Sequence, residues 1–394
     1  MLSGALSALM KRQLLFLILF LSALAQGAEA RANALSERLA LSGFGTFALI
    51  QSDNDQAGFV RDIGQPKGAN EGVSVRTDSR LGLQASLNIT RELDIVAQGL
   101  SQYRDTDDFS PELMLAFMRY SPDPELQWRL GRLGWDVDLM SDSRYVGYAY
   151  PWIRPPVEHF GILQLTYIDG ADVTLKRPLW NGLSWARFFV GHSESRLHLE
   201  HDLYADIEAD RIFGGHLNHE TGAWHFRAGY TRIDAEPGFG GERVEAFERA
   251  TGLVADDFFN EMLGFGDLRL YSLGASYDPG TFQLQTVWNR NMLGGKDVWV
   301  DSRFVTAAWR IDRLTPYVIY SHVDTHFEGT ARTDAGLEQS TWSLGLRHDV
   351  THQLALKAQL DFVDTQEPGV LWRGGTNWGG GQSTLLNLGL DFIF

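Results

Sequence analysis

The chain contains no cysteine among its 394 residues. Disulfide-stapled secreted domains, zinc ribbons and iron–sulfur proteins all depend on cysteine thiolates, so the sequence excludes these classes. Basic residues are also few, since 34 Lys and Arg stand against 50 Asp and Glu and the formal net charge is −16. Proteins that bind nucleic acid neutralise its phosphates with a basic surface, so this composition argues against a DNA or RNA partner.

Long hydrophobic runs are scarce as well. Only residues 14–24 suggest a membrane helix, and this run is shorter than the roughly 20 apolar residues that cross a bilayer, which excludes a multi-helix membrane protein. The run follows two basic residues and precedes small ones, an order typical of a secretory signal peptide. We predict that residues 1–30 form a signal peptide cleaved after Ala25 or Ala30, and that residues 31–394 form one domain. An uncleaved anchor is the alternative.

Beyond this segment the hydrophobic pattern has a period of two, which predicts β-strands. In residues 75–89, for example, Leu81 and Leu83 share one face, while Arg76 and Arg80 share the other. The alternation recurs to the C-terminus, and no long helical stretch interrupts it. A soluble β-sandwich produces the same pattern, so alternation alone does not decide the architecture.

The connections between the predicted strands alternate in length along the whole chain. Tight turns are predicted at 88–91, 121–124, 178–182, 219–222, 278–280, 312–314 and 349–351. Long polar segments lie between them at 51–72, 134–160, 192–205, 234–266, 325–336 and 364–383, with shorter ones near 105–109 and 292–296. Short turns at one end and long loops at the other are typical of a transmembrane β-barrel with periplasmic turns and extracellular loops.

This spacing predicts an all-β fold of about sixteen antiparallel strands, an even number as in single-chain bacterial outer-membrane barrels. Each strand with its connection has about 23 residues, which leaves room for the ~10 residues that a tilted strand needs to cross a bilayer. A barrel of this size can enclose a water-filled channel, whereas a barrel of about eight strands is filled by side chains.

The last predicted strand ends the chain on an aromatic residue. Leu388, Leu390, Phe392 and Phe394 share one face, which looks like the closing strand of bacterial outer-membrane barrels. Further motifs follow in the expected order: Ser-Arg-Leu-Gly-Leu at 79–83, Leu-Gly-Arg at 130–132 and Leu-Gly-Leu-Arg-His-Asp at 344–349. On these residues the chain resembles the Gram-negative general porin family over most of its length.

The resemblance implies a sixteen-stranded and often trimeric barrel whose third long loop folds into the lumen and narrows the pore. It implies an exported protein of the Gram-negative outer membrane, in contact with outer-membrane lipid and lipopolysaccharide. Phe394 is similar to the C-terminal signal that the barrel-assembly machinery reads. The second loop of the series, the short one near 105–109, looks too short to latch onto a neighbouring subunit, so a monomer and a homotrimer both stay open.

A diffusion channel selects solutes by its width and by the charges at its narrowest section. The third long segment, residues 134–160, carries the four carboxylates that we predict to line the constriction, namely Asp136, Asp138, Asp142 and Glu158. On the facing wall, the alternation predicts three inward basic residues, Arg76, Arg80 and Arg129. The family motif adds Arg132, which needs a β-bulge to face inward. Alternatively, the loop carboxylates only solvate a surface segment.

Aromatic residues are dense in the same segment. Tyr145, Tyr148 and Trp152 offer faces on which sugar rings or aromatic solutes can stack. In the alternative interpretation, which we favour, they anchor the loop against the wall, because an inward-folded loop needs apolar contacts.

The sequence contains no nucleophile elbow and no phosphate-binding loop, so no catalytic site is predicted. The nearest approach to a metal site, His198 and His201 with His192, lacks the H-E-x-x-H order, and no metal or other cofactor is expected. We predict a passive outer-membrane porin for small hydrophilic solutes and ions. The alternatives are a substrate-specific channel for a sugar or an aromatic acid, a barrel enzyme, and a scaffold that threads a partner through its lumen.

Overall fold

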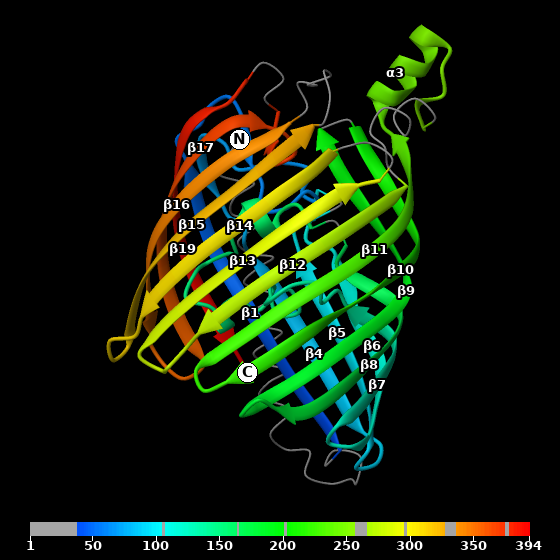
Figure 1. Ribbon diagram of the computed structural model, residues 1–394. Coiled ribbons are helices and arrows are strands. Elements are labelled where there is room, and N and C mark those ends of the chain that lie inside the picture. The colour runs from blue at the N-terminus through cyan, green and yellow to red at the C-terminus, as the bar shows by residue number, and fades with distance from the viewer. Residues whose placement is uncertain are drawn as a thin grey trace.

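The computed structural model describes residues 38–104, 107–163, 165–200, 203–256, 266–294, 298–327, 336–374 and 378–394. Within these residues, sixteen long antiparallel strands close into a barrel, which confirms the predicted fold class (Figure 1). The predicted signal peptide at 1–30 lies outside the described residues and stays a prediction.

The sixteen strands follow one another around the barrel in chain order. They are β1 (Leu39–Ser52), β4 (Arg80–Asn88), β5 (Leu93–Gln102), β6 (Pro111–Asp123), β7 (Leu126–Gly134), β8 (Tyr167–Leu179), β9 (Gly182–Glu200), β10 (Leu203–Thr221), β11 (Trp224–Gly240), β12 (Asp267–Tyr277), β13 (Phe282–Leu293), β14 (Val298–Trp309), β15 (Leu314–Phe327), β16 (Leu337–Asp349), β17 (Leu354–Pro368) and β19 (Gly381–Ile393). In the part of the chain that the structure describes, no helix is both long and apolar enough to span a membrane.

The barrel closes because its first strand pairs along both edges. β1 runs antiparallel to β4 on one side and to β19 on the other. Phe394 and Gly43 exchange backbone N–H···O hydrogen bonds with N···O distances of 3.0 Å. The ring of Phe394 lies against Gly43 and the ring of Phe392 lies against Gly45, where a side chain on either glycine would overlap the ring. The two glycines therefore let the aromatic residues of the last strand pack over the seam.

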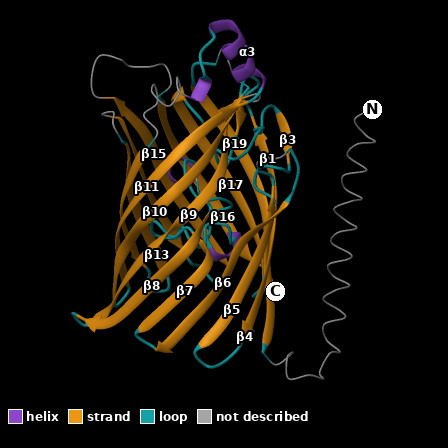
Figure 2. Cartoon of the chain, turned by 90° about the vertical axis from the view of Figure 1, so that its right-hand side faces the viewer, coloured by secondary structure: helices purple, strands orange, loops and turns teal. Residues whose placement is uncertain are grey.

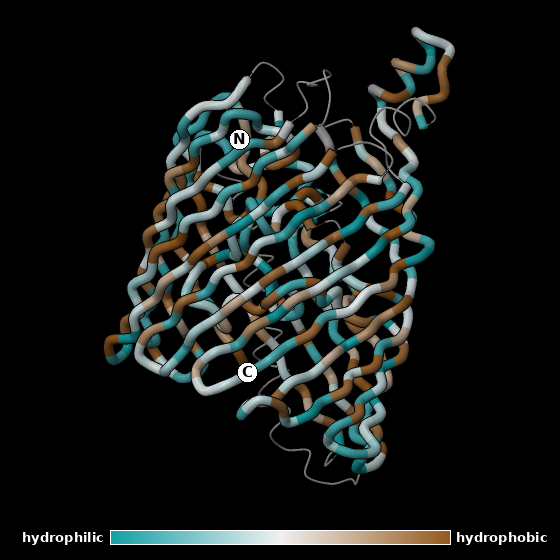
Figure 3. The backbone as a smooth tube through the Cα atoms, in the orientation of Figure 1, coloured by the Kyte–Doolittle hydropathy of each residue, from teal (hydrophilic) through white to brown (hydrophobic). Residues whose placement is uncertain are grey.

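Side chains alternate along each strand as in a membrane barrel. In β17, Leu356 and Phe362 face outward and are each 45% exposed, whereas Lys357 and Asp361 face inward and are buried. Figure 3 shows brown and teal segments alternating along neighbouring strands. Along β17, apolar residues thus face outward, and polar residues alternate with them on the inward face.

Short turns join the strands at one end of the barrel, and the long loops lie at the other (Figure 2). The segment at 192–205 differs from the prediction, because β9 and β10 extend through most of it as a long hairpin. Two inward residues of the segment, Leu197 and Ala205, pack with the neighbouring Ile207 on Ile63 of the first long loop, which explains why this polar segment remains strand. The segment at 234–266 carries helix α3 (Glu242–Thr251), which projects beyond the barrel.

Two long loops fold into the barrel instead of over it. The third long loop, residues 135–166, contains the short helices η1 (Gly147–Ala149) and α2 (Val157–Phe160). Its apolar side chains form a buried cluster with inward residues of strands from β8 to β14. The first long loop contains β2 (Gly58–Phe59), which pairs with β18 (Trp372–Arg373) of the last loop, and is followed by β3 (Gly72–Ser74), which pairs with β1. The third long loop thus lies inside the barrel, which confirms the prediction that it folds into the lumen.

Candidate functional site

The third long loop is bonded to the barrel wall along its length, and its first anchor is Asp136. The carboxylate of Asp136 accepts hydrogen bonds from Arg227 Nη2 at 2.6 Å, from His216 Nε2 at 3.2 Å and from Arg187. Asp136 is 6% exposed, and a carboxylate buried this deeply needs such partners to stay charged. The start of the loop is therefore held against β9, β10 and β11.

The second anchor joins two points of the loop to each other and to the wall. His159 Nε2 donates to Asp138 Oδ2 at 3.0 Å, and Asn289 Nδ2 donates to the same oxygen at 2.9 Å. Ser302 Oγ lies 3.1 Å from His159 Nδ1. Asp138, His159 and Ser302 form one hydrogen-bonded chain, but the two ring nitrogens are exchanged relative to a hydrolase triad, in which Asp bonds to Nδ1 and Ser to Nε2. Each of the three is at most 1% exposed, so a substrate cannot reach the serine, and the group acts as a clasp between loop and wall.

Glu158, at the start of α2, is the third anchor. Its carboxylate accepts hydrogen bonds from Ser321 Oγ at 2.6 Å, from Gln339 Nε2 at 2.7 Å and from the Thr341 hydroxyl. These neutral donors of β15 and β16 take the place of water around a carboxylate that is 1% exposed. The loop is thereby fixed to the wall opposite β7 as well.

Cations complete the attachment near β17. Arg154 of the loop pairs with Asp361 of that strand at 2.5 Å. Lys357 is another inward residue of β17, and it donates to the carbonyl oxygens of Gly147 at 2.8 Å and Trp152 at 2.7 Å. Both backbone and side chains of the loop are therefore held by inward residues of a single strand.

Asp142 is placed differently from the other three predicted carboxylates. It is exposed, and it accepts a hydrogen bond from the neighbouring Ser143 at 3.1 Å. Asp136, Arg187 and Arg227 lie within electrostatic reach. Of the four loop carboxylates, the structure thus buries Asp136, Asp138 and Glu158 in contacts with the wall and leaves Asp142 accessible to water in the lumen.

Two of the predicted basic residues point into the barrel. Arg80 of β4 is 4% exposed, and its Nη2 lies 3.5 Å from the carbonyl oxygen of Ile153 in the loop. Arg129 of β7 forms a two-point ion pair with Asp172 of β8, in which Arg129 Nε lies 2.9 Å from Asp172 Oδ2. The structure brings Arg80 against the loop, but it pairs Arg129 with a wall carboxylate that the sequence analysis did not single out.

Arg76 lies at the outer mouth and not in the pore wall. The strand begins at Arg80 instead of near residue 75, so Arg76 belongs to the preceding turn. Its side chain is 47% exposed, and Nη1 lies 3.4 Å from Asp107 Oδ1. Arg76 therefore does not line the constriction as expected. The alternating sequence pattern continues from β4 back to residue 75, but residues 75–79 do not form strand.

Arg132 faces outward, which corrects the expectation that it lines the pore. The register between β7 and β8 is continuous, so no bulge turns the side chain inward. Leu130 on the same face is 58% exposed, whereas the next residue, Leu133, is 2% exposed. Arg132 pairs with Asp169 on the outer wall at 2.6 Å. Strict alternation, without the family motif, places this residue correctly.

The aromatic residues of the loop lie against the wall. Trp152 is 1% exposed and stacks on Tyr150 with ring centroids 5.2 Å apart. Tyr148 donates its hydroxyl to the His352 carbonyl at 2.8 Å, and Tyr145 lies under the guanidinium of Arg144, 5.0 Å from the ring centre. This geometry agrees with anchoring and gives Trp152 no free face on which a solute can stack.

Sequence reasoning missed the wall partners of the loop, chiefly Arg187, His216, Arg227 and Lys357. The alternation of each strand already places these residues on the inward face. The alternation does not predict the path of the third loop. That path decides which inward residues of distant strands contact the loop. Asp391 of β19, which forms an ion pair with Lys357 at 2.6 Å, is a further wall residue that sequence reasoning missed.

Ion pairs also hold the first long loop in place. Asp62 pairs with Arg61 at 2.7 Å and lies 3.7 Å from Arg104, which follows β5. Burial by itself raises the pKa of the Asp62 carboxyl, but the two arginines outweigh this effect and hold the pKa below its usual value. Arg373 of β18 donates to the carbonyl oxygen of Gln65, which ties the last loop to the first.

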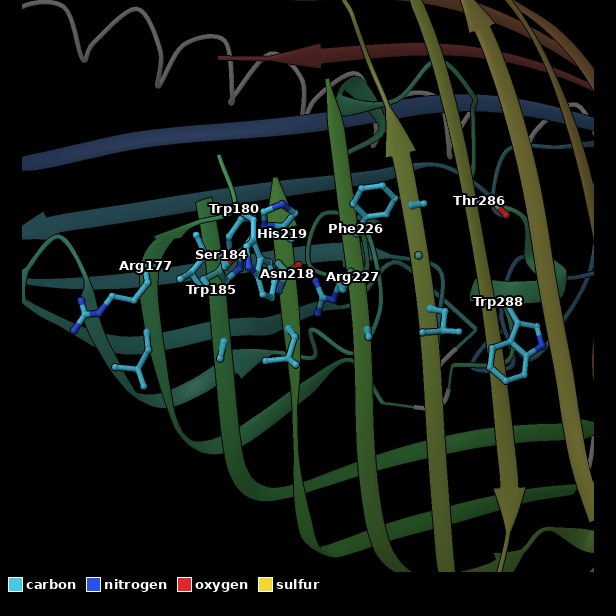
Figure 4. Close-up of a pocket in the computed structure, with 18 residues that line it drawn as sticks. Arg177, Trp180, Ser184, Trp185, Asn218, His219, Phe226, Arg227, Thr286 and Trp288 are labelled. Carbon is cyan, nitrogen blue, oxygen red and sulfur yellow. Dashed lines mark hydrogen bonds between the residues drawn. The ribbon is translucent and has the colours of Figure 1, made fainter. Parts of the chain in front are cut away.

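A shallow depression of about 800 Å³ lies in the outer wall across β8 to β13 (Figure 4). Its floor includes the outward residues Ala186, Ala228 and Ala275, and the bulkier Leu217 and Leu273 stand beside them. These positions alternate with inward residues, so the depression faces away from the lumen. Most of its exposed lining surface is apolar, as expected for a surface in contact with hydrocarbon, although Arg177, Ser184 and His219 also line it.

No cluster of three or more His, Asp or Glu residues within the described ranges could hold a metal ion. His201, part of the nearest sequence candidate, lies outside those ranges.

A family model identifies the family of this chain, and solved structures share its fold. The chain matches the Gram-negative porin family over residues 17–368. The fold is similar to the outer-membrane channel DcaP of Acinetobacter baumannii (TM-score 0.58, 9% identity, 91% of this chain and 98% of that one) and to OmpF of Salmonella typhi in complex with daunomycin (0.57, 11%, 90% and 97%). It is also similar to an anion-selective porin from Comamonas acidovorans (0.55, 14%, 90% and 99%). No protein of curated function matches the chain.

Proposed function

The chain belongs to the Gram-negative porin family and forms a diffusion channel of the outer membrane, and on that premise we propose that small hydrophilic solutes and ions cross it passively. The observation that carries this proposal is the third long loop, which lies inside a barrel of sixteen strands and is bonded to the wall. A fixed loop in a wide barrel sets a constriction of constant size without a moving part or a cofactor.

Within this proposal, Asp142 is the loop carboxylate that permeating ions meet. It is exposed, whereas Asp136, Asp138 and Glu158 are held by wall residues. The electrostatic interaction between a wall charge and a passing ion is stronger when the two are close. Asp142 therefore contributes more to ion selectivity than the buried carboxylates do.

The absence of cysteine makes this proposal directly testable. We expect purified Asp142→Cys channels in planar bilayers to lose part of their single-channel conductance when a bulky, charged thiol reagent is added. The matched control is Leu356→Cys, because Leu356 faces outward on β17. An unaltered current after complete labelling of Asp142→Cys, shown by mass spectrometry, places the permeation path elsewhere. A barrel that conducts no current at all contradicts the channel itself.

The proposal also includes export and assembly. The segment at 1–30 directs export, the last strand ending at Phe394 is read by the barrel-assembly machinery, and outer-membrane lipid and lipopolysaccharide surround the wall. A homotrimer is the assembly we propose, supported by the trimer form among similar structures, an outer-membrane protein of Vibrio cholerae. Analytical ultracentrifugation in detergent distinguishes a trimer from a monomer.

A further inference from the structure

A tryptophan faces the lumen between the third long loop and the turn end of the barrel. Trp185 of β9 pairs in the sheet with Asn218 of β10, whose side chain is buried on the inward face. Arg187, the next inward residue of β9, bonds to Asp136 of the third loop. Because β9 begins at Gly182, directly after a short turn, Trp185 lies on the turn-end side of this loop anchor. A solute that enters from the turn end reaches Trp185 before it reaches the loop.

A histidine and a leucine extend the tryptophan into an apolar surface. The ring centroids of Trp185 and His225 lie 5.3 Å apart, with an interplanar angle of 32°. His225 Nε2 donates to Asn218 Oδ1 at 3.0 Å, which fixes the imidazole. Leu183, the preceding inward residue of β9, is 40% exposed, and Trp185 is only partly buried. The interior of a membrane barrel is polar as a rule, so this Trp185 surface of Leu183, Trp185 and His225 indicates a site for a ligand.

Polar groups of both signs lie beside the Trp185 surface. Lys176 of β8 pairs with Trp185 in the sheet and shares the inward face with the buried Thr174. In the part of the chain that the structure describes, Lys176 Nζ has no carboxylate oxygen within ion-pair distance. Glu220, the inward residue that follows Asn218 on β10, is exposed. The cation and the carboxylate offer hydrogen-bond donors and acceptors, and their charges balance.

We propose that the Trp185 surface binds a neutral pyranose sugar. The inference rests on the proposed diffusion channel, for which it names a class of solute. The C–H groups on one face of a pyranose ring can lie on an indole, while the hydroxyls around the ring both donate and accept hydrogen bonds. Lys176 provides donors for these hydroxyls, and Glu220 provides acceptors. An aromatic carboxylate fits less well, because Glu220 repels it.

The test uses the purified full-length protein in detergent and two probes, maltotriose as a neutral sugar and benzoate as an aromatic carboxylate. Titration calorimetry measures both affinities, and we expect maltotriose to bind more tightly than benzoate. In Trp185→Ala, the affinity for maltotriose should fall about threefold to tenfold, the loss that corresponds to one aromatic contact. Trp309→Ala is the matched control, because Trp309 faces outward near the turn end and is 59% exposed.

Two further variants keep the result interpretable. Trp185→Phe keeps an aromatic face and should bind maltotriose with an affinity between those of wild type and Trp185→Ala. Lys176→Gln keeps hydrogen-bond donors but loses the charge, so it should bind maltotriose almost as wild type does. Heat-modifiable mobility on gels shows that each variant is folded. Equal maltotriose affinity in wild type and folded Trp185→Ala overturns the proposal, and so does tighter binding of benzoate that is lost in Lys176→Gln.

Current recordings in planar bilayers separate this inference from the proposed channel. Maltotriose should interrupt the current of wild type, more often when it is added at the turn end, and it should interrupt that of Trp185→Ala less. A barrel that conducts ions normally and binds no maltotriose contradicts this inference alone. A barrel that binds maltotriose in the calorimeter but carries no current contradicts the diffusion channel instead.

Discussion

At the scale of single residues, the lumen is organised by buried ion pairs between loop and wall. Asp136 receives two arginines and a histidine from three different strands. Removing one partner of such a group leaves the others charged, buried and unpaired, which costs more than the pair itself contributes.

We therefore expect Asp136→Ala to destabilise the folded barrel by roughly 3–5 kcal/mol and to loosen the start of the third loop. Denaturant titration of the purified protein measures the first effect, and limited proteolysis of the loop measures the second. Asp142→Ala is the matched control, because Asp142 is exposed on the same loop. Equal midpoints for the two variants would mean that the Asp136 cluster does not hold the loop.

Asp62 gives the outer mouth a dependence on pH. Its pKa in the folded state lies below the usual value of 3.8 because of Arg61 and Arg104, despite burial. A carboxyl with a lowered folded-state pKa stabilises the fold fully above its ordinary pKa, and this contribution is lost as the pH falls through the folded-state pKa. We expect the first long loop to detach below about pH 4, which hydrogen exchange of residues 58–65 can measure.

The control for this effect is Asp62→Asn, which should show the loosened loop at neutral pH and little further change on acidification. A wild-type loop that stays protected through pH 3 while Asp62→Asn is unprotected at pH 7 would assign the role of Asp62 to hydrogen bonding and not to charge.

At the scale of elements, the register of β4 can be tested with neighbouring residues. Leu83 faces outward and is 48% exposed, whereas Gln84 faces inward and accepts a hydrogen bond from Gln98 at 3.0 Å. We expect Leu83→Arg to impair membrane insertion, since a cation near the midplane of a barrel costs about 2–4 kcal/mol. Gln84→Arg should insert normally because the lumen hydrates it. Heat-modifiable mobility on gels measures insertion, and the reverse result would shift the strand by one residue.

The seam between β1 and β19 depends on its glycines. A side chain at Gly43 would overlap the ring of Phe394, and the backbones of these two residues exchange hydrogen bonds. We expect Gly43→Val and deletion of Phe394 each to lower the yield of assembled barrel. Ala358→Val, on the outward face of β17, is the control. Normal yield after deletion of Phe394 would show that closure does not need the terminal residue.

The sequence predicts strands better than it predicts connections, for a physical reason. Period-two alternation is a local property, so it places Arg80 and Leu83 on the correct faces. The same rule places Arg187 and Arg227 inward, but their contacts with Asp136 depend on the path of a loop. Arg132 was misplaced where a family motif was preferred to the alternation.

At the scale of the whole molecule, the loops join parts of the chain that are far apart. The first and last long loops pair through β2 and β18, and Arg154 bonds to Asn387 across 233 residues of sequence. The third long loop also contacts strands at both ends of the chain, because Thr46 of β1 and Asp391 of β19 lie beside Gly147.

These contacts between distant parts of the chain affect the rate of folding. Contacts between residues so distant in sequence form only after long segments of chain have come together, which makes folding slow. The third loop cannot complete its contacts with Asp361 and Asn387 before β17 and β19 have joined the sheet. Attachment of the third loop to the wall and closure of the seam are therefore one late step. In a chain arrested before its last hairpin forms, Arg154 and Lys357 cannot reach their partners.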